Sequence, residues 1–509
     1  MSSDRIFKLP EVFPPVLDKY LGMPTIFTLI VLFQGCFGGM GIIQTPKALT
    51  DAINSPISRF IFLAAIAYTA TGDIETAIFT TVIFLVVLHM LRTKEEKDKL
   101  KDKSKPLFGL PIAIKDLSDV VGIETTYGFP GYKNNFPKQN SFFVDLLIKN
   151  GAIIIGKTNS AELGVGGHTI NRLFGPTSNV YDLNKSAAGS SGGASTAVAA
   201  GLLPFADGTD QMGSCRGPAA YSNTYGFRPT PGLIASSRVG HNSKLPLLTT
   251  PGCFSKNPED MSIMLDVIVG KNSSDPYSFN LNGRFKEALI KDKDLSNIKI
   301  GWLSNMNNNY NIEHEILDMC EDSLNKLNNE NIIIEKLKPD FNTDDLWNSW
   351  TALRSKSIYN DTINMGIKNI DSMTYQAIWE YKKGSVINLK NIELALSQKN
   401  SCLHQINKIF ANFDLLALPS AQIFPFDKQI QYPTKINNIE LDTYHRWLEV
   451  FILSSLLELP TMTVPVGFNK NNLPMGMQII GKRGDDLRVI AFAKKYEEIF
   501  NYSNITPKY

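Results

Sequence analysis

The sequence has few cysteines and few histidines for its 509 residues. Its five cysteines are scattered and none has the C-x-x-C spacing, which argues against a zinc site. An odd, dispersed cysteine count suits a reducing compartment. The six histidines are also dispersed, so the sequence offers no histidine suitably placed to activate a nucleophilic serine.

An excess of charge of one sign is also lacking. The chain has 51 basic and 49 acidic residues, which leaves a formal net charge of +2. Proteins that bind nucleic acids usually carry a strongly basic patch or a high net positive charge. We therefore expect no nucleic-acid partner, and no part of the sequence requires a metal or a cofactor.

Long apolar runs are concentrated in the first hundred residues. The run at 23–43 is almost wholly apolar, and shorter runs cover 60–71 and 77–91. About 20 apolar residues span a bilayer core, so the first run is long enough to cross a membrane. The other two would form a hairpin, a re-entrant pair or one interrupted span. Charges and a proline pair in residues 1–20 argue against a cleavable signal peptide.

A highly charged stretch at 92–105 follows the apolar runs, with seven basic and four acidic residues. Because basic residues next to membrane helices favour the cytoplasmic side, this stretch and the domain after it should be cytoplasmic. We predict an N-terminal segment over 1–104 with two or three membrane helices, a second domain over 105–509, and a membrane localisation through 23–91. The alternative is an apolar helical layer packed on the second domain.

Three short stretches carry the chemistry. Gly109–Asp116 (GLPIAIKD) places Lys115 directly after an apolar run that is typical of a buried strand. Gly189–Gly193 (GSSGG) and Gly208–Arg216 (GTDQMGSCR) place serines in glycine-rich turns. Each stretch alone has an ordinary interpretation, as a strand end, a flexible loop or a common turn. Together, one lysine and two serines indicate nucleophilic catalysis with an amine as the base.

The residue types suit that chemistry. A serine hydroxyl is a poor nucleophile until a base removes its proton. Lysine becomes a base when burial lowers the pKa of its ammonium group, and residues 111–114 supply apolar surroundings for Lys115. Glycines let the backbone approach a substrate closely, and consecutive backbone N–H groups in such a turn can hold a developing oxyanion.

The three stretches, in this order, resemble the amidase signature hydrolases. The resemblance covers residues 105 to the C-terminus and includes Gly156–Asn159 (GKTN), Ala188–Pro204, Asp414–Ser420, Leu459–Gly467 and Leu473–Gln478. It implies a single large α/β domain with a mixed central β-sheet covered by helices, and chemistry without a cofactor.

Position by position, the resemblance implies a Ser-cisSer-Lys triad. Lys115 aligns with the base, Ser190 with the bridging serine on a cis peptide bond, and Ser214 with the nucleophile that forms the acyl-enzyme. The proton relay would run from Ser214 through Ser190 to Lys115.

The turn before the nucleophile departs from the usual Gly-Gly-Ser pattern, because Met212 precedes Gly213. The methionine can still donate its backbone N–H, and we expect its bulk to narrow or reshape the pocket. The oxyanion hole would be formed by the backbone N–H groups of Gln211, Met212, Gly213 and Ser214. Supporting roles would fall to Ser191, Asp210 and Arg216, and Cys215 would be a small buried filler.

Coarse patterns agree with an α/β fold. Unbroken apolar runs at 112–114, 152–155 and 415–418 predict strands buried on both faces. Small residues at 195–200 and helical spacing at 313–328 predict two helices.

The sequence does not decide the function of the region 272–400 or of His168. The Asn- and Lys-rich region 272–400 should contain the variable part that sets substrate choice, but its sequence identifies no substrate. His168 lies between the triad segments and is interpreted as a structural histidine, with a place in the pocket wall as the alternative.

The sequence thus predicts a membrane-anchored enzyme that hydrolyses a carboxylic amide to an acid and an amine or ammonia. The membrane segment makes an apolar amide substrate attractive by analogy alone. One alternative is the amidase subunit of a tRNA-dependent amidotransferase, which releases ammonia from glutamine, and another is a non-catalytic scaffold of the same fold. The oligomeric state is undecided, and a homodimer is left open.

Overall fold

The computed structural model describes residues 104–236, 245–291, 295, 298–328, 330–339 and 341–507. The chain divides into two units, and the first has residues 104–111 and 150–156 described. In this unit the Leu107 N–H donates to the Asn150 carbonyl (3.0 Å) and the Ile153 N–H to the Leu110 carbonyl (2.8 Å). The second unit comprises Ile112–Lys149 and Lys157–Tyr509.

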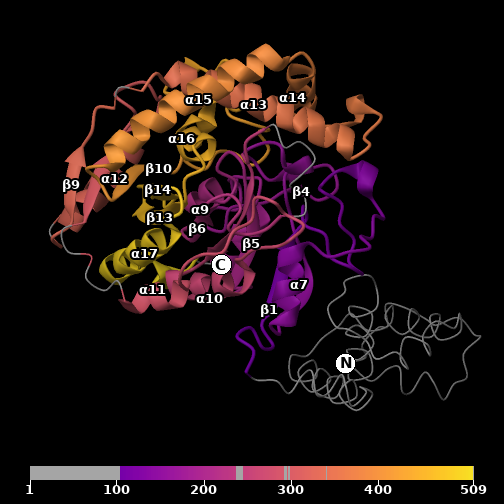
Figure 1. Ribbon diagram of the computed structural model, residues 1–509, viewed down its shortest axis with the longest axis horizontal. Helices are drawn as coiled ribbons and strands as arrows, with labels where there is room; N and C mark the ends of the chain where they lie inside the picture. The colour runs from indigo at the N-terminus through magenta and orange to yellow at the C-terminus, as the bar shows by residue number, and fades with distance from the viewer. Residues whose placement is uncertain are drawn as a thin grey trace, which may run out of the picture. The chain divides into compact units, whose positions relative to one another are not determined.

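A mixed sheet of eight strands forms the centre of the second unit (Figure 1), in the order β5-β7-β6-β13-β14-β10-β8-β9. Its strands are β5 (Phe205–Asp210), β6 (Tyr225–Arg228), β7 (Thr250–Ser255), β8 (Lys299–Trp302), β9 (Ile333–Lys336), β10 (Leu415–Pro419), β13 (Thr461–Phe468) and β14 (Pro474–Ile480). Pairing is antiparallel from β5 to β10 and parallel among β10, β8 and β9. This is the mixed central sheet that the sequence predicts.

The central strands are apolar on both faces because helices cover them. Every residue of β10 and β14 is buried, which confirms the prediction for 415–418. Residues 112–114 lie in β1 (Pro111–Lys115) and are buried as expected. The expectation for 152–155 is wrong in part, because β2 (Ile153–Thr158) has an exposed Ile153.

Helices pack against the sheet and against one another. They are α7 (Phe142–Lys149), α8 (Gly192–Ala199), α9 (Arg216–Ser222), α10 (Pro258–Ile268), α11 (Phe285–Lys291), α12 (His314–Asn328), α16 (Ile452–Leu456) and α17 (Asp486–Phe500). Helices α8 and α9 contact each other, and α9 lies on β6, β13 and β14, whereas α10, α11 and α17 form a second group. The predicted helices at 195–200 and 313–328 are confirmed as α8 and α12.

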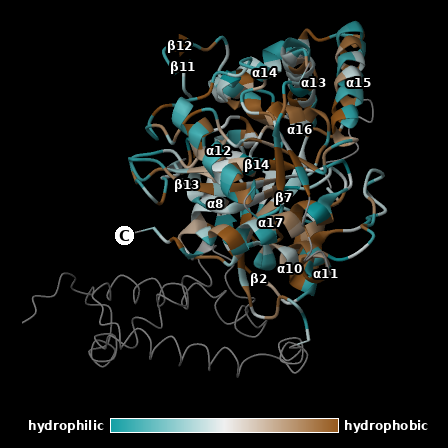
Figure 2. Ribbon diagram, turned by 90° about the vertical axis from the view of Figure 1, so that its left-hand side faces the viewer, coloured by the Kyte–Doolittle hydropathy of each residue, from teal (hydrophilic) through white to brown (hydrophobic). Residues whose placement is uncertain are grey.

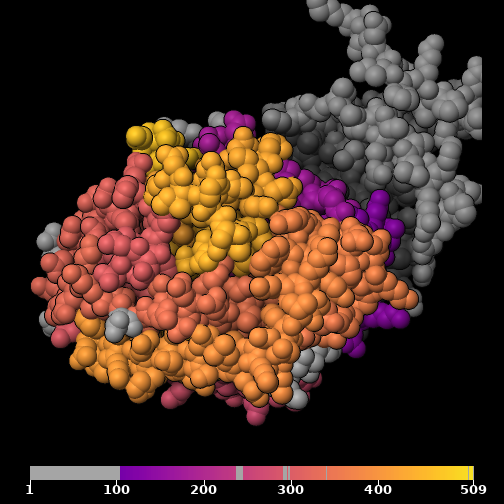
Figure 3. Space-filling view, turned by 90° about the horizontal axis from the view of Figure 1, so that it is seen from above, coloured from indigo at the N-terminus to yellow at the C-terminus, as the bar shows by residue number. Residues whose placement is uncertain are grey.

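Three long helices form an outer layer, drawn in orange in Figure 1: α13 (Thr343–Asn364), α14 (Tyr375–Ser385) and α15 (Leu389–Phe410). Asn342 caps α13 by accepting from the Asp344 and Asp345 N–H groups. Residues of this layer make up a broad part of the surface in Figure 3, and Figure 2 shows hydrophilic residues along α12 and α14. Helix α13 packs on α14, α15 and α16, so it connects this layer to the core.

Short elements complete the described part. The two-residue strands are β3 (Ile170–Asn171), β4 (Gly175–Pro176), β11 (Lys435–Ile436) and β12 (Ile439–Glu440). The 3-10 helices are η1 (Pro130–Tyr132), η2 (Glu162–Gly164), η3 (Ile370–Ser372), η4 (Arg446–Phe451) and η5 (Tyr502–Asn504).

The predicted membrane runs at 23–43, 60–71 and 77–91 lie outside the described residues. Among the residues that are described, no helix is both long enough and apolar enough to cross a membrane. The proposed domain boundary between 104 and 105 stays a prediction.

Candidate active site

Lys115 ends β1 and is completely buried. Its Nζ lies 2.9 Å from Ser190 Oγ, 2.6 Å from Ser191 Oγ and 2.8 Å from Thr209 Oγ1. All three hydroxyls therefore lie within hydrogen-bond distance of the Lys115 amine nitrogen. The structure therefore brings Lys115 and Ser190 together as the sequence predicts, and adds Thr209, which sequence reasoning missed.

The serine loop is held tightly against its neighbours. The Gly189–Ser190 peptide bond is cis, as the resemblance implies. A Cβ on Gly193 would lie 2.5 Å from the backbone nitrogen of Asn159, so a side chain cannot be accommodated there. Ser190 is almost fully buried, and Ser191 stands at the N-cap position of α8.

Ser214 lies in the turn between β5 and α9. Gly213 has a φ of +83°, and a Cβ there would lie 2.3 Å from the Phe451 ring, so only glycine fits. The Gly213 N–H donates to Asp210 Oδ1 and the Cys215 N–H to Asp210 Oδ2, each at 3.0 Å. Asp210 therefore braces the turn on both sides of Ser214.

Arg216 holds Asp210, and through it the turn, in place. Its guanidinium is fully buried and donates to both carboxylate oxygens of Asp210, at 3.0 and 2.8 Å. It also donates to Ser454 Oγ, Ser455 Oγ, Gln478 Oε1 and the Phe451 carbonyl. Burial alone would raise the pKa of Asp210, but Arg216 and Arg228 together hold that pKa well below its ordinary value. Asp210 is thus ionised in the fold.

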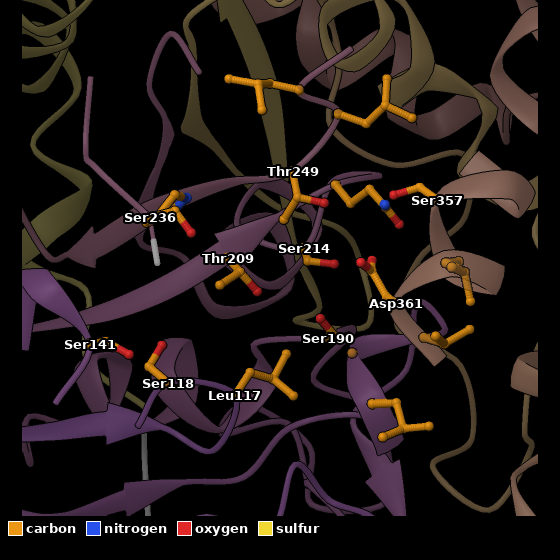
Figure 4. Close-up of a pocket in the computed structure, with 18 of the residues that line it drawn as sticks. Leu117, Ser118, Ser141, Ser190, Thr209, Ser214, Ser236, Thr249, Ser357 and Asp361 are labelled. Atoms are coloured by element: carbon orange, nitrogen blue, oxygen red, sulfur yellow. The ribbon is translucent and has the colours of Figure 1, made fainter. Parts of the chain in front are cut away.

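A cavity of about 230 Å³ opens beside these residues. Figure 4 shows Ser190, Thr209 and Ser214 on its wall, with Ser357 and Asp361 facing them from another element. That element is α13, which contributes Ser357, Ile358, Asn360, Asp361 and Asn364 to the lining. The sequence predicted that the region 272–400 shapes the pocket but did not identify this helix.

Met212 does not narrow the cavity, so that part of the expectation is wrong, while a reshaped pocket stays a prediction. Its side chain is 4% exposed and is absent from the described cavity lining. Instead, the Trp350 indole Nε1–H donates to Met212 Sδ at 3.2 Å. Trp350 belongs to α13, so the methionine ties the nucleophile turn to the helix that forms the opposite wall.

His168 has a structural place outside the described lining of the cavity. Its Nδ1 lies 2.7 Å from Ser186 Oγ and its Nε2 2.8 Å from the Lys428 carbonyl. Burial lowers the pKa of His168 to about 4, so the ring is neutral at pH 7. Cys215 is fully buried, as expected for a small filler. Within the described residues, no group of three or more His, Cys, Asp or Glu side chains is arranged to hold a metal.

Comparison with known proteins identifies the family. The family model described as Amidase matches residues 69–490. The chain is 29% identical to a glutamyl-tRNA(Gln) amidotransferase subunit of Saccharolobus solfataricus, over 82% of this chain and 88% of that protein. It is 28% identical to an acylamidase of Rhodococcus erythropolis, over 80% of this chain and 84% of that protein. Its fold is similar to that of a bacterial aryl acylamidase (TM-score 0.72, 23% identity, 94% of both chains).

These matches also correct the predicted membrane localisation. The family match begins at residue 69 and therefore includes the apolar run at 77–91, which was expected to form a hairpin, a re-entrant pair or one interrupted span with the run at 60–71. The archaeal amidotransferase protein and the acylamidase match this chain over most of their own lengths. With no membrane-spanning helix among the described residues, the membrane localisation and the membrane partner are not supported.

The mixed sheet with its covering helices is the amidase signature α/β fold. The family match covers more than half of the chain and includes Ser190, Ser191 and Thr209, whose hydroxyls contact the Lys115 amine. The chain belongs to the amidase family, and it is a hydrolase of carbon–nitrogen amide bonds.

Proposed function

We propose that the chain hydrolyses a carboxylic amide through an acyl-enzyme on Ser214. The observation that carries this proposal is the buried Lys115 amine, whose Nζ lies 2.9 Å from Ser190 Oγ. The hydroxyls of Ser190 and Ser214 line one cavity, which supports a relay from Ser214 through Ser190 to Lys115 (Figure 4).

In the first step, the neutral Lys115 amine accepts the Ser190 proton while Ser190 Oγ accepts the proton of Ser214. Ser214 Oγ bonds to the carbonyl carbon, and the electron pair of the C=O π bond moves to the oxygen. The relay then returns a proton to the substrate nitrogen, the C–N bond breaks, and the amine or ammonia leaves. Water attacks the acyl-enzyme by the same route and releases the acid.

Backbone N–H groups around Ser214 would stabilise the oxyanion. Because the Gly213 N–H already donates to Asp210, we assign this role to the N–H groups of Gln211, Met212 and Ser214. Asp210 and Arg216 hold the turn in place. Ser191 and Thr209 position the Lys115 amine beside Ser190, because both hydroxyls contact Nζ.

A fluorophosphonate probe tests the nucleophile. We expect covalent labelling of the wild-type protein at Ser214, found by peptide mass spectrometry, and its loss in Ser214→Ala. Ser236→Ala removes another hydroxyl of the cavity wall and should leave labelling intact. Labelling that survives Ser214→Ala would overturn the assignment.

A second candidate is glutamine hydrolysis for a tRNA-dependent amidotransferase. The observation that favours it is the similarity to relatives named as glutamyl-tRNA(Gln) amidotransferase subunits, at 29% identity over 448 residues. Ammonia release from glutamine by the isolated chain, compared with release from aryl amides, separates the candidates. Glutamine turnover that appears only when partner proteins are added would favour the second.

A further inference from the structure

We propose that His168 is a positioning residue for Ser190, the serine that bridges the proton relay. It acts through the Ser186 hydroxyl and the backbone of Ala188. This inference rests on the proposed function, since it concerns the relay that serves Ser214. His168 is 2% exposed and lies outside the described lining of the cavity, so its effect on the reaction passes through these other residues.

The imidazole of His168 joins two segments that are far apart in the sequence. Its Nε2 lies 2.8 Å from the Lys428 carbonyl oxygen, and its Nδ1 lies 2.7 Å from Ser186 Oγ. A carbonyl oxygen only accepts hydrogen bonds, so Nε2 carries the ring proton. Burial lowers the pKa of His168 to about 4, so the ring is neutral at pH 7 and Nδ1 is left as an acceptor. The Ser186 hydroxyl therefore donates to Nδ1.

The direction of that hydroxyl leaves its oxygen to accept from the serine loop. Ser186 Oγ accepts the Ala188 N–H at 3.0 Å. A hydroxyl has one hydrogen, which Ser186 uses on His168 while its oxygen holds Ala188. Ser186 is fully buried, so these bonds form in surroundings where a polar group without a partner is costly.

Ala188 depends on such support because its backbone lies in the left-handed region. Its φ is +55°, which is uncommon for a residue with a Cβ and persists where the surroundings hold it. The Ala188 carbonyl accepts the Thr169 N–H at 2.9 Å, while its N–H donates to Ser186 Oγ. The segment of His168 and Thr169 therefore holds both backbone polar groups of Ala188.

Ser190 follows Ala188 by two residues. A Cβ on Gly189 would lie 2.7 Å from the backbone carbonyl carbon of His168, so the loop rests directly on the histidine segment. Ser190 Oγ lies 2.9 Å from Lys115 Nζ, and a shift of Ala188 would pass through Gly189 to this contact. Misplacing a reacting group by about 1 Å can slow a reaction by about 100-fold. The bond between His168 and Ser186 thus helps to set the geometry of the relay.

The rate of fluorophosphonate labelling at Ser214 tests the proposal without a choice of amide. In that reaction Ser214 Oγ bonds to phosphorus, fluoride leaves, and the Ser214 proton passes through Ser190 to Lys115. Measurements at several probe concentrations give the maximal labelling rate and the half-saturating concentration separately. Because His168 positions the relay and lies outside the described lining, its variants should lower the maximal rate and leave the half-saturating concentration nearly unchanged.

Two amide variants separate the two bonds of the imidazole. His168→Asn can keep an acceptor close to the position of Nδ1, whereas His168→Gln can keep a donor close to that of Nε2. We expect His168→Gln and Ser186→Ala each to lower the maximal labelling rate about tenfold, and His168→Asn to stay within about twofold of the wild type. The double variant of His168→Gln and Ser186→Ala should lose no more than Ser186→Ala alone, because both changes break the same bond.

The matched control is Ser262→Ala, which deletes another buried hydroxyl. Ser262 Oγ donates to the Glu259 carbonyl at 2.7 Å within α10. This variant should lower the free energy of unfolding about as Ser186→Ala does, but it should be labelled at the wild-type rate. Urea unfolding of each variant separates a loss of stability from a loss of positioning.

Wild-type labelling rates in His168→Gln, or losses that add up in the double variant, would overturn the proposal. Equal slowing of His168→Asn and His168→Gln, or of Ser186→Ala and Ser262→Ala, would do the same. Its failure is distinguishable from failure of the proposed function. If the wild-type protein is labelled at Ser214 and the variants keep its rate, the nucleophile stands and only the role of His168 is wrong. If the wild-type protein is not labelled at Ser214, the catalytic assignment fails and this inference fails with it.

Discussion

The two walls of the cavity are built in different ways. The serine wall is formed by Ser190, Thr209 and Ser214. Ser190 and Thr209 hydrogen-bond to the buried Lys115 amine, and Ser214 lies in the turn that the buried pair of Asp210 and Arg216 holds. The helix wall is one face of α13, where Ser357 and Asn360 are half-buried and Asp361 is exposed. Under the proposed function, this comparison predicts that reaction and selectivity are separated in this molecule. A fixed set of buried contacts holds the reacting groups, while a single helix presents the groups that meet the rest of the substrate.

We expect the largest effect on the free energy of unfolding from Arg216→Met, because Arg216 holds the Asp210 carboxylate that braces the turn of Ser214. Arg216→Met removes the donors to both oxygens of Asp210 and leaves a buried carboxylate with Arg228 as its remaining cationic partner. Removing one partner of a buried ion pair costs about 3–5 kcal/mol of unfolding free energy. Urea unfolding followed by intrinsic fluorescence measures this loss, and fluorophosphonate labelling of Ser214 should fall with it.

The matched control is Lys435→Met, which breaks an ion pair with Glu440 whose side chains are 57% and 68% exposed. Exposed pairs contribute about 0–1 kcal/mol, so this variant should unfold almost as the wild type does. Equal losses in the two variants would show that the serine wall does not depend on its buried ion pair.

The serine wall was the predictable part of the site. Its residues lie in short segments in which glycine is required by close contacts, as at Gly193 beside Asn159 and Gly213 beside Phe451. Such steric requirements leave a local pattern that can be read from one sequence. The bond from Lys115 to Thr209 was missed, because it joins residues 94 apart and a threonine in a turn has many ordinary uses.

The helix wall could not be predicted in the same way. The contact of Trp350 with Met212 spans 138 residues, and nothing in the local sequence of either residue indicates the other. Met212 was therefore expected to narrow or reshape the pocket, whereas its sulfur is buried against the indole. The apolar runs near the N-terminus lie outside the described residues, and apolar composition alone does not distinguish a membrane segment from a segment buried in a protein.

The next prediction concerns the buried carboxyl of Asp207, whose ionisation should change the free energy of unfolding by less than Arg216→Met does. Asp207 Oδ1 accepts the Lys115 backbone N–H at 2.8 Å, while its Oδ2 is buried without a hydrogen-bond partner in the described residues. Burial raises the pKa of Asp207 to about 6, although Lys157 and Lys115 favour its charged form.

The sign of the effect follows from proton binding. Below about pH 4, Asp207 is protonated in both states and burial of the carboxyl carries no charge penalty. As pH rises to about 6, the unfolded chain loses this proton first, so the folded state becomes relatively less stable, by about 3 kcal/mol in all. Asp207→Asn stays neutral, and the free energy of unfolding of the variant relative to the wild type should therefore increase by about that amount between pH 4 and pH 7.

Urea unfolding of both proteins at the two pH values measures the change, and the exposed Asp371→Asn serves as control. A difference between Asp207→Asn and the wild type that is independent of pH would show that Asp207 is ionised in the fold at pH 4 as well.

The smallest expected effect tests whether the two walls act separately. Trp350→Phe keeps most of the buried ring but removes the N–H that donates to Met212 Sδ, a bond worth about 1 kcal/mol. Because Met212 lies in the turn that carries Ser214, we expect kcat to fall about fivefold with KM nearly unchanged. Steady-state kinetics on an aryl amide give both constants, and Trp379→Phe on α14 is the matched indole deletion away from the turn. A rise in KM with kcat unchanged would instead place Trp350 wholly in the helix wall, because the loss would then concern substrate binding and not the position of the nucleophile.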